Sequence, residues 1–279
     1  MDDDFPDAGF LDYATIDVAD LVKHHARLSD PKDFIDLDAL YGPKKYYAIV
    51  GDIPQGMCLK TQGSLKISGT VAGSSVLNAQ GNIDVDGDLG YDVHLFADAI
   101  SAHDVGVDCN LEARNGGVTL DHLAKNIRIR AHGMVYFISA KERLNVLAGK
   151  ELSFTSSGDH SILLAQKVVG QRVGAMSHVT ATADSVSLAH AGPDSKIFSA
   201  EPADVHVADP TVLVGGYSGL DDPFLASPPD LPITRTHFTP EGCGIYKDSG
   251  GNYMLSDAMR ARYPQDAMNN LIIELLKII

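Results

Sequence analysis

Hydrophobic and polar residues alternate along most of the chain, and the alternation recurs at a regular interval. The stretch GSLKISGTV at 63–71 is followed eighteen residues later by GNIDVDGDL at 81–89, with the same order of glycine, aliphatic and polar positions. Alternation with a period of two residues is typical of a β-strand that buries one face. The pattern therefore predicts a succession of short strands.

Short aliphatic starts recur about every 17 residues through the middle of the chain. A first series comprises Leu65, Ile83, Ile100, Val118, Val135, Leu152, Val169 and Val186. A second series comprises Val76, Val93, Leu111, Ile127, Leu144, Ile162, Val179 and Ile197. A third series, of alanines just after the second strand, comprises Ala79, Ala97, Ala113, Ala131, Ala148, Ala165 and Ala181. Because the three series advance together, a single two-stranded unit repeats along the chain.

This repeat predicts a mainly β fold, a single-stranded parallel β-helix or β-solenoid with coils of about 17 residues and right-handed winding. Each coil is expected to stack on the previous one at ~4.8 Å, so that equivalent side chains form ladders. A finer period of six residues from Leu65 to Leu95 fits three short sides per coil, and it lapses at Ser101. Both ends of such a rod expose strand edges that need a cap or a partner.

The repeat divides the chain into four parts. Residues 1–50 lack it and are predicted to form a helical N-terminal cap, whereas the solenoid is expected over 51–220. Four prolines within 221–234 predict an extended linker. Residues 235–279 are predicted to form a helical tail.

Two helices are expected in the N-terminal cap. The stretch TIDVADLVKHHARL predicts one with Thr15 as its N-cap, because Val18, Leu21 and Val22 then share a face. The stretch SDPKDFIDLDAL predicts a second helix with Asp30 as its N-cap. Together they are expected to cover the first coil.

The C-terminal stretch QDAMNNLIIELLKII places apolar side chains at helical spacing. The interaction residues predicted on this face are Met268, Leu271, Ile272, Leu275, Leu276 and Ile279. A face this apolar has to be buried, which leaves two interpretations open: docking on the chain's own solenoid, or packing against another subunit or protein partner. Membrane insertion fits poorly, because the segment is short and carries little positive charge.

Composition and charge argue against some classes of binding partner. The chain has 279 residues and a net charge of −15, which argues against binding a nucleic-acid backbone or an anionic membrane. Cys58, Cys109 and Cys243 form no C-x-x-C pair, so reduced structural thiols are expected. No apolar run reaches the ~18 residues of a membrane span, and the acidic start has no apolar signal region. A cytoplasmic protein is expected, with a virion or a particle secreted without a standard signal as the alternative.

Four polar residues are candidates for chemistry. His103, Asp104, Asp121 and His122 end the first strands of successive coils, where stacking brings them together. Such a column of Asp and His suits a divalent metal or a general base, but both residues are also common in solvated turns. We expect the second interpretation, and hence no metal and no cofactor.

Other signs of catalysis are weak. The coils keep a length of 16 to 18 residues, which leaves no room for the long loops that wall the saccharide groove of pectate-lyase-type enzymes. The sequence also has no nucleophile elbow, phosphate-binding loop or dinucleotide fingerprint in a usable context. The expectation is therefore a protein without enzymatic activity.

The coil motifs resemble those of two related protein groups. GSLKISGTV and GNIDVDGDL, followed by VHLFADAI and LEARNGGV, are similar to the coils of flagellar-assembly-protein-A (FapA) type β-solenoids and of the polymer-forming bactofilins. The similarity covers 63–118 well and the later coils only by period. It implies a right-handed β-helix with a structural or scaffolding role, and it supplies no catalytic residues to carry over.

The sequence thus favours a non-enzymatic scaffolding β-solenoid that self-assembles, or docks a protein partner, through its C-terminal apolar helix. One alternative is a rod in a phage or secreted particle, such as a fibre, baseplate or adhesin-like component. A second alternative is a saccharide- or metal-dependent solenoid enzyme, which would need the Asp and His column as its site.

Overall fold

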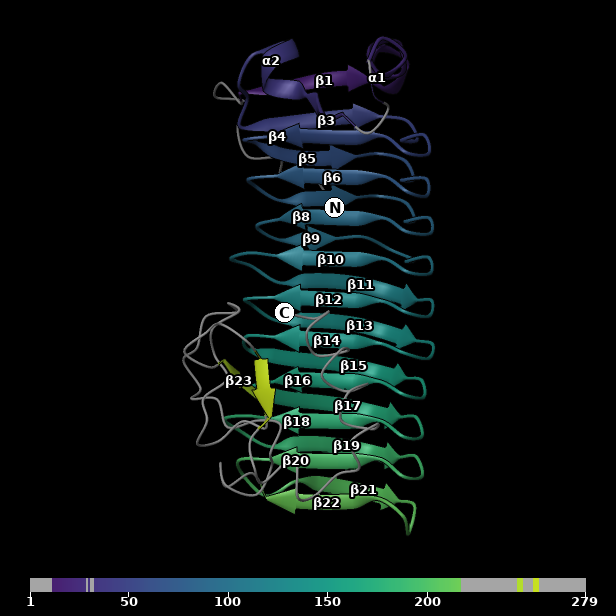
Figure 1. Cartoon of the computed structure of the whole chain (residues 1–279), viewed down its shortest axis with the longest axis vertical. Helices are drawn as coiled ribbons and strands as arrows, with labels where there is room; N and C mark the ends of the chain where they lie inside the picture. The colour runs from purple at the N-terminus through teal and green to yellow at the C-terminus, as the bar shows by residue number, and fades with distance from the viewer. Residues whose placement is uncertain (1–11, 29, 31–32, 217–244, 248–252, 256–279) are drawn as a thin grey trace, which may run out of the picture.

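The strands stack into a long rod, a parallel β-solenoid (Figure 1). The computed structural model describes residues 12–28, 30, 33–216, 245–247 and 253–255. Each coil contributes one strand to each of two parallel sheets, which have eleven strands apiece. The predicted solenoid with coils of about 17 residues is confirmed. Its right-handed winding stays a prediction.

The odd-numbered strands form the first sheet, called sheet A, and the even-numbered strands form sheet B. Sheet A contains β1 (Tyr13–Asp17), β3 (Tyr46–Val50), β5 (Ser64–Ile67), β7 (Ile83–Val85), β9 (Ile100–Ser101), β11 (Val118–Leu123), β13 (Val135–Ala140), β15 (Glu151–Ser157), β17 (Lys167–Val173), β19 (Val186–Ala191) and β21 (Asp204–Ala208). Sheet B contains β2 (Ile35–Asp36), β4 (Cys58–Thr61), β6 (Val76–Ala79), β8 (His94–Ala97), β10 (Asn110–Ala113), β12 (Arg128–Ala131), β14 (Asn145–Ala148), β16 (Ile162–Ala165), β18 (His178–Ala181), β20 (Lys196–Ser199) and β22 (Leu213–Gly216).

The register confirms most of the first aliphatic series and corrects one member. The residues from Leu65 to Leu152 pair in the expected order along sheet A. Leu152 then pairs with Val168, and Val168 with Val186, so Val169 was one residue out of register. Val168 and Val169 are both apolar, and the sequence alone did not show which of them points inward.

The residues of the second series occupy three kinds of position: outward on a sheet B strand, inward on a sheet B strand, or in the corner before it. Val76 and Ile162 face outward from sheet B, whereas Val93, Ile127 and Leu144 fill the corner just before a strand. The inward ladder of sheet B consists instead of Leu59, Leu77, Leu95, Leu111, Ile129, Val146, Leu163, Val179 and Ile197. The alanine series is confirmed where Ala97 pairs with Ala113 and where Ala165 pairs with Ala181. Corner and strand residues are both buried, so period alone did not separate them.

A third, shorter side closes the early coils. Single parallel bridges link Ile53, Val71, Leu89, Val105 and Leu123. Leu123 also ends β11, so this side merges into sheet A at that coil. The third side thus continues beyond Ser101, where the six-residue period lapses.

The corner before each sheet B strand from β6 to β20 contains one non-glycine residue with positive φ. These non-glycine residues are Ser74, Asp92, Asp108, Asn126, Arg143, His160, Met176 and Asp194. Asn and Asp tolerate this left-handed conformation, but Met176, at φ 52°, is an unusual occupant. Their recurrence in eight successive coils shows that the solenoid geometry imposes the turn.

The N-terminal residues differ from the expected helical cap. Strands β1, β2 and β3 already belong to the two sheets, so the solenoid begins before residue 51. Ile16 is buried and pairs with Ile49, which places Thr15 inside β1 and not at a helix cap. Residues 13–17 alternate between outward and inward positions of a strand, and this pattern decided their conformation in place of the helical spacing of the apolar residues.

Two short helices interrupt these first strands. Helix α1 spans Val18–His25 and starts after Asp17, whose Oδ1 accepts a hydrogen bond from the Ala19 amide at 2.8 Å. Helix α2 spans Leu37–Tyr41 and is capped by Asp36, so Asp30 is not the N-cap of this helix.

Part of the expected helical tail is extended instead. Strands β23 (Ile245–Lys247) and β24 (Tyr253–Leu255) form an antiparallel pair. The linker 221–234 and the predicted helix over Met268–Ile279 lie outside the described residues.

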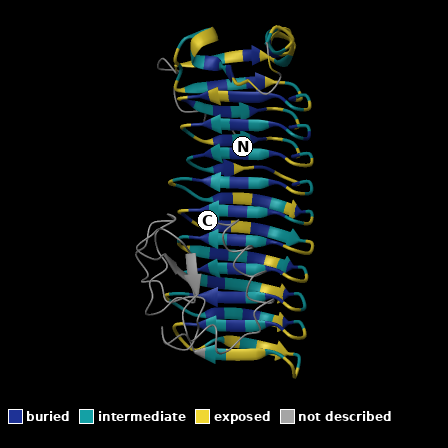
Figure 2. Cartoon of the chain, viewed as in Figure 1, coloured by how far each residue is buried: buried dark blue, intermediate teal, exposed yellow. Residues whose placement is uncertain are grey.

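Aliphatic and aromatic ladders fill the space between the two sheets. Figure 2 shows that buried positions recur along the strands of both sheets. Phe137 and Phe154 occupy the same inward position of successive coils, and their rings stack with centroids 5.2 Å apart. The next coil has Gly170 at this position. The absence of a side chain there leaves room for the ring of Phe154.

Candidate functional site

The structure brings two of the predicted site residues into contact. His103, just after β9, lies one coil from Asp121 in β11, and its Nδ1 is 2.6 Å from Asp121 Oδ2. This hydrogen bond, followed by the charge of Asp121, raises the pKa of His103. Both side chains are exposed, 60% for His103 and 36% for Asp121. The pair can exchange a proton, but it sits on an open edge.

The other two candidates have separate partners. His122 Nδ1 lies 2.7 Å from Ser139 Oγ in the next coil. The backbone amide of Asp104 donates to Asp88 Oδ1 at 3.4 Å. Stacking therefore occurs as expected, yet the described part of the chain contains no group of three His, Cys, Asp or Glu side chains arranged to hold a metal ion.

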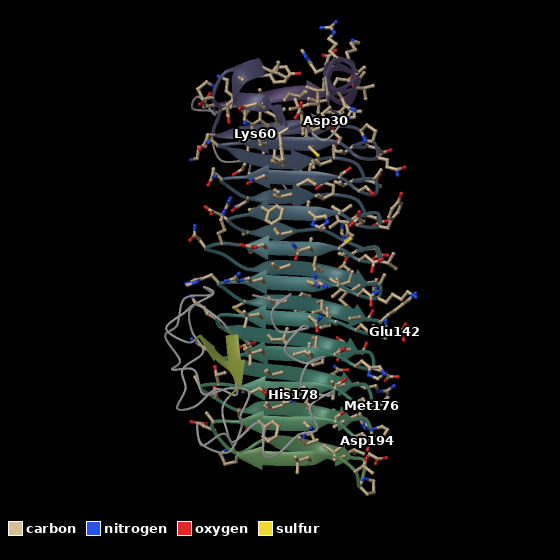
Figure 3. The ribbon with its side chains drawn as sticks, viewed as in Figure 1. Asp30, Lys60, Glu142, Met176, His178 and Asp194 are labelled. Carbon is tan, nitrogen blue, oxygen red and sulfur yellow. The ribbon has the colours of Figure 1, made fainter. Side chains whose placement is uncertain are left out.

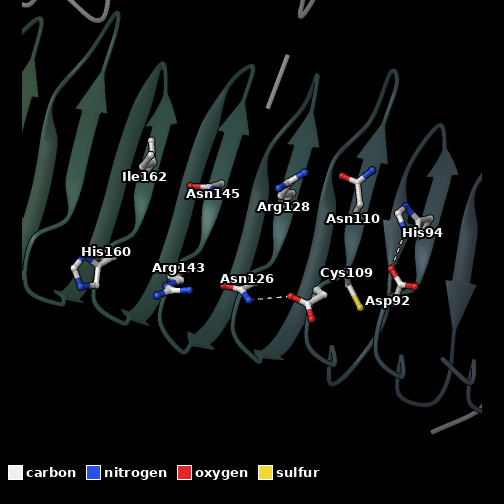
Figure 4. A pocket seen from close by; sticks show the side chains of 11 residues that line it. Asp92, His94, Cys109, Asn110, Asn126, Arg128, Arg143, Asn145, His160 and Ile162 are labelled. Carbon is white, nitrogen blue, oxygen red and sulfur yellow. Dashed lines mark hydrogen bonds and ion pairs between the residues drawn. The ribbon is translucent and has the colours of Figure 1, made fainter. Parts of the chain in front are cut away.

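A hollow of about 650 Å³ runs along the outer side of sheet B, beside the corner with positive φ (Figure 4). Its lining residues are Asp92, His94, Asp108, Cys109, Asn110, Asn126, Arg128, Arg143, Asn145, His160 and Ile162. One column comes from the corner and the other from outward positions of β8 to β16.

Sequence reasoning missed this groove because it followed only the inward ladders. The available signal was the run of polar residues at the alternate positions.

The groove offers hydrogen bonds and charge to a polar ligand. Its corner column changes from acidic at Asp92 and Asp108 to basic at Arg143. Asn126 Nδ2 donates to Asp108 Oδ1 at 2.9 Å, so neighbouring coils are tied to each other along this column. The thiol of Cys109 is buried, which raises its pKa to about 11 and keeps it protonated. Cys109 is therefore not an activated nucleophile.

The two ends of the solenoid differ. At the first coil, α1 contacts β1 and β2, and Leu21 of α1 and Leu37 of α2 are fully buried. At the last coil, Val214 continues the inward ladder by pairing with Ile197, yet it is 46% exposed because no further described coil covers it (Figure 2). Leu213 and Val207 are exposed there as well, but both face outward. Among the described residues, nothing covers the core at this end, which is called the open end below.

The remaining predicted residues lie outside the described part of the chain. These are Met268, Leu271, Ile272, Leu275, Leu276 and Ile279. Neither α1 nor α2, nor any other helix in the described segments, is long and apolar enough to cross a bilayer.

No protein-family model matches the sequence, and the comparisons with curated proteins and with solved structures find no significant match either.

Proposed function

We propose that the protein is a non-enzymatic structural rod that associates with a second copy through its open end. The observation that carries this proposal is the exposure of Val214, an inward-ladder residue, at the end of the described coils. Strands β21 and β22 also present edge backbone groups there, and such edges pair readily with another strand. The open end of a second copy can cover Val214 with apolar surface and can pair with the free edges of β21 and β22.

The difference between the two ends limits the number of copies that can associate. Because α1 and α2 lie over the first coil (Figure 1), head-to-tail stacking would meet a covered surface. Contact between two open ends is isologous and closes after two copies. The proposal is therefore a dimer of rods with a defined length, in contrast to the open polymers that the bactofilin resemblance suggests.

The other functions expected from the sequence are less well supported. A scaffold attached through Met268–Ile279 uses a surface outside the described residues. A rod in a phage or secreted particle fits the same shape, and a threefold assembly would favour it. The enzyme alternative is opposed by the exposure of the His103 and Asp121 pair and by the protonated thiol of Cys109. A cytoplasmic location belongs to the same proposal.

The test is the mass of the full-length protein measured by light scattering, beside the variant Val214→Asp. A charge at this inward position is expected to convert a dimer to a monomer, because the paired ends would have to bury it. The matched control is Val207→Asp, at an exposed position of the neighbouring strand β21 that faces outward, and it should remain a dimer. A monomeric full-length protein, or a dimer that survives Val214→Asp, would refute the proposal.

A further inference from the structure

The outer face of sheet B changes character along the rod. On the strands β8 to β12, the outward residues are His94, Phe96, Asn110, Glu112, Arg128 and Arg130. On the strands β14 to β20, they are Asn145, Leu147, Ile162, Leu164, His178, Thr180, Lys196 and Phe198. The second group contains a single charged side chain outside its histidine, Lys196. The half of the face nearer the open end is therefore the more apolar, with Leu147, Ile162, Leu164 and Phe198 where the other half has only Phe96.

Four residues make this apolar surface continuous. Leu147 pairs with Leu164 in the next coil, and Ile162 lies beside both on the same face. Phe198 follows two coils after Leu164 in the same column. The surface spans the strands β14 to β20, which at ~4.8 Å per step is about 14 Å along the rod.

Thr180 is more buried than its outward position predicts. Thr180 lies between the inward residues Val179 and Ala181, so its side chain points outward, yet it is 0% exposed. Its Oγ1 has no hydrogen-bond partner among the described residues. His178 lies on the same strand, two residues beyond the corner residue Met176 (Figure 3), and its half-buried ring is 5.5 Å from that of Phe198. Burial, with a smaller contribution from Lys196, lowers the pKa of His178 to about 4.

We infer that the chain's own C-terminal run, Met268–Ile279, docks on the apolar outer face of sheet B between β14 and β20. The chain leaves the solenoid at Gly216 in β22, one coil beyond the end of this face, and residues 217–279 follow. The segment between Gly216 and Met268 is long enough to return over the last coils even if it is compact. A helix over Met268–Ile279 would be ~18 Å long, close to the length of the face.

The chemistry of the two surfaces also matches. The run Met268–Ile279 has a continuous apolar stripe that needs cover. The face offers Leu147, Ile162, Leu164 and Phe198 in the half of sheet B that lies nearest the exit of the chain. Docking within one chain leaves the open end at Val214 free for association, so this inference does not depend on the proposed dimer.

The experiment follows the titration of His178 by NMR in the full chain and in a variant that lacks residues 266–279. The His178 signal is assigned by its loss in His178→Gln. In the full chain, His178 is expected to titrate near pH 4. Removal of the docked segment should expose it and move the midpoint by roughly two units toward the usual value of about 6.5.

A second variant tests the face itself. Leu164→Gln places a neutral polar group in the middle of the apolar surface and should shift His178 in the same direction, although the solenoid stays folded because the residue points outward. Phe96→Gln, in the same column on β8, is the matched control and should leave His178 unchanged.

The His178 midpoint tests the docking of Met268–Ile279, and the mass of the protein tests the dimer. An unchanged His178 midpoint in both the deletion and Leu164→Gln would overturn the inference. A midpoint in the full chain that depends on protein concentration would also overturn it, because the docked segment would then come from a second copy. Mass measurements on the same samples report separately on the open end. A loss of the dimer without a change in His178 bears only on the proposed function.

Discussion

The position of Gly170 allows a sharp test of how the inward ladders are packed. Phe137 and Phe154 stack nearly parallel, at an interplanar angle of 9°, and the ring of Phe154 extends over Gly170 in the next coil. A Cβ atom built on Gly170 would lie 2.6 Å from Phe154 Cε2, which is closer than real contacts allow. We therefore expect the substitution Gly170→Ala to displace the ring of Phe154.

Two opposing effects set the magnitude. Overpacking of a well-filled core typically lowers the free energy of unfolding by about 1–3 kcal/mol. Replacing glycine by alanine in a strand returns roughly 0.5–1 kcal/mol, because the unfolded chain loses freedom. The net expectation for Gly170→Ala is a loss of about 1–2 kcal/mol. A smaller residue at position 154 would free the space that the added methyl group needs.

The assay is equilibrium urea unfolding followed by circular dichroism. Gly170→Ala, Phe154→Leu and the double variant are compared with the natural chain. The double variant should be more stable than the sum of the two single changes by about 1 kcal/mol, because the two sites are in contact. If Gly170→Ala unfolds at the same urea concentration as the natural chain, or if the two changes are additive, the ring has room to move and the reasoning is refuted.

Two further predictions concern polar contacts. Asp38→Ala should lower the free energy of unfolding by about 1–3 kcal/mol, because Asp38 accepts hydrogen bonds from the Gln62 amide at 2.6 Å and from the buried Tyr47 hydroxyl at 2.7 Å. Thermal melting should separate it from the exposed control Asp33→Ala, and equal losses would contradict this role. Asp121→Asn should lower the pKa of His103, which NMR titration measures, since Asp121 raises it. Protonated His103 contributes stability below its unfolded pKa of about 6.5, and the contribution is lost as pH rises through the higher folded value. The melting temperatures of the natural chain and Asp121→Asn should therefore converge as the pH rises above about 6.5, and a constant difference would contradict the sign.

Much of the fold was readable because stacking imposes its own period on the sequence. Every coil lies on the one before it, so an inward residue such as Leu65 recurs as Ile83 and Ile100 at almost constant spacing. The alanines at the end of the sheet B strands recur for the same reason. Neighbours in adjacent coils could be inferred in the same way, and His103 and Asp121 do meet.

The errors arose where several apolar residues stand together. At Val168 and Val169, a shift of one residue reverses which side chain points inward, and only strand pairing decides it. Asp17 replaces Thr15 as the helix cap because β1 first pairs with β3, a contact between distant parts of the chain. Local pattern carries no information about such pairings.

The sequence by itself determined that the protein is a stacked β-solenoid, because a repeated coil needs repeated side chains. Only the tertiary structure decided what the surfaces of the described residues present: a groove along the corner, a more apolar half of sheet B around Leu164, and an exposed inward residue, Val214, at the last described coil. These features depend on which side of a strand a residue takes and on what lies over it. Both are set by packing between coils, which periodicity alone does not encode.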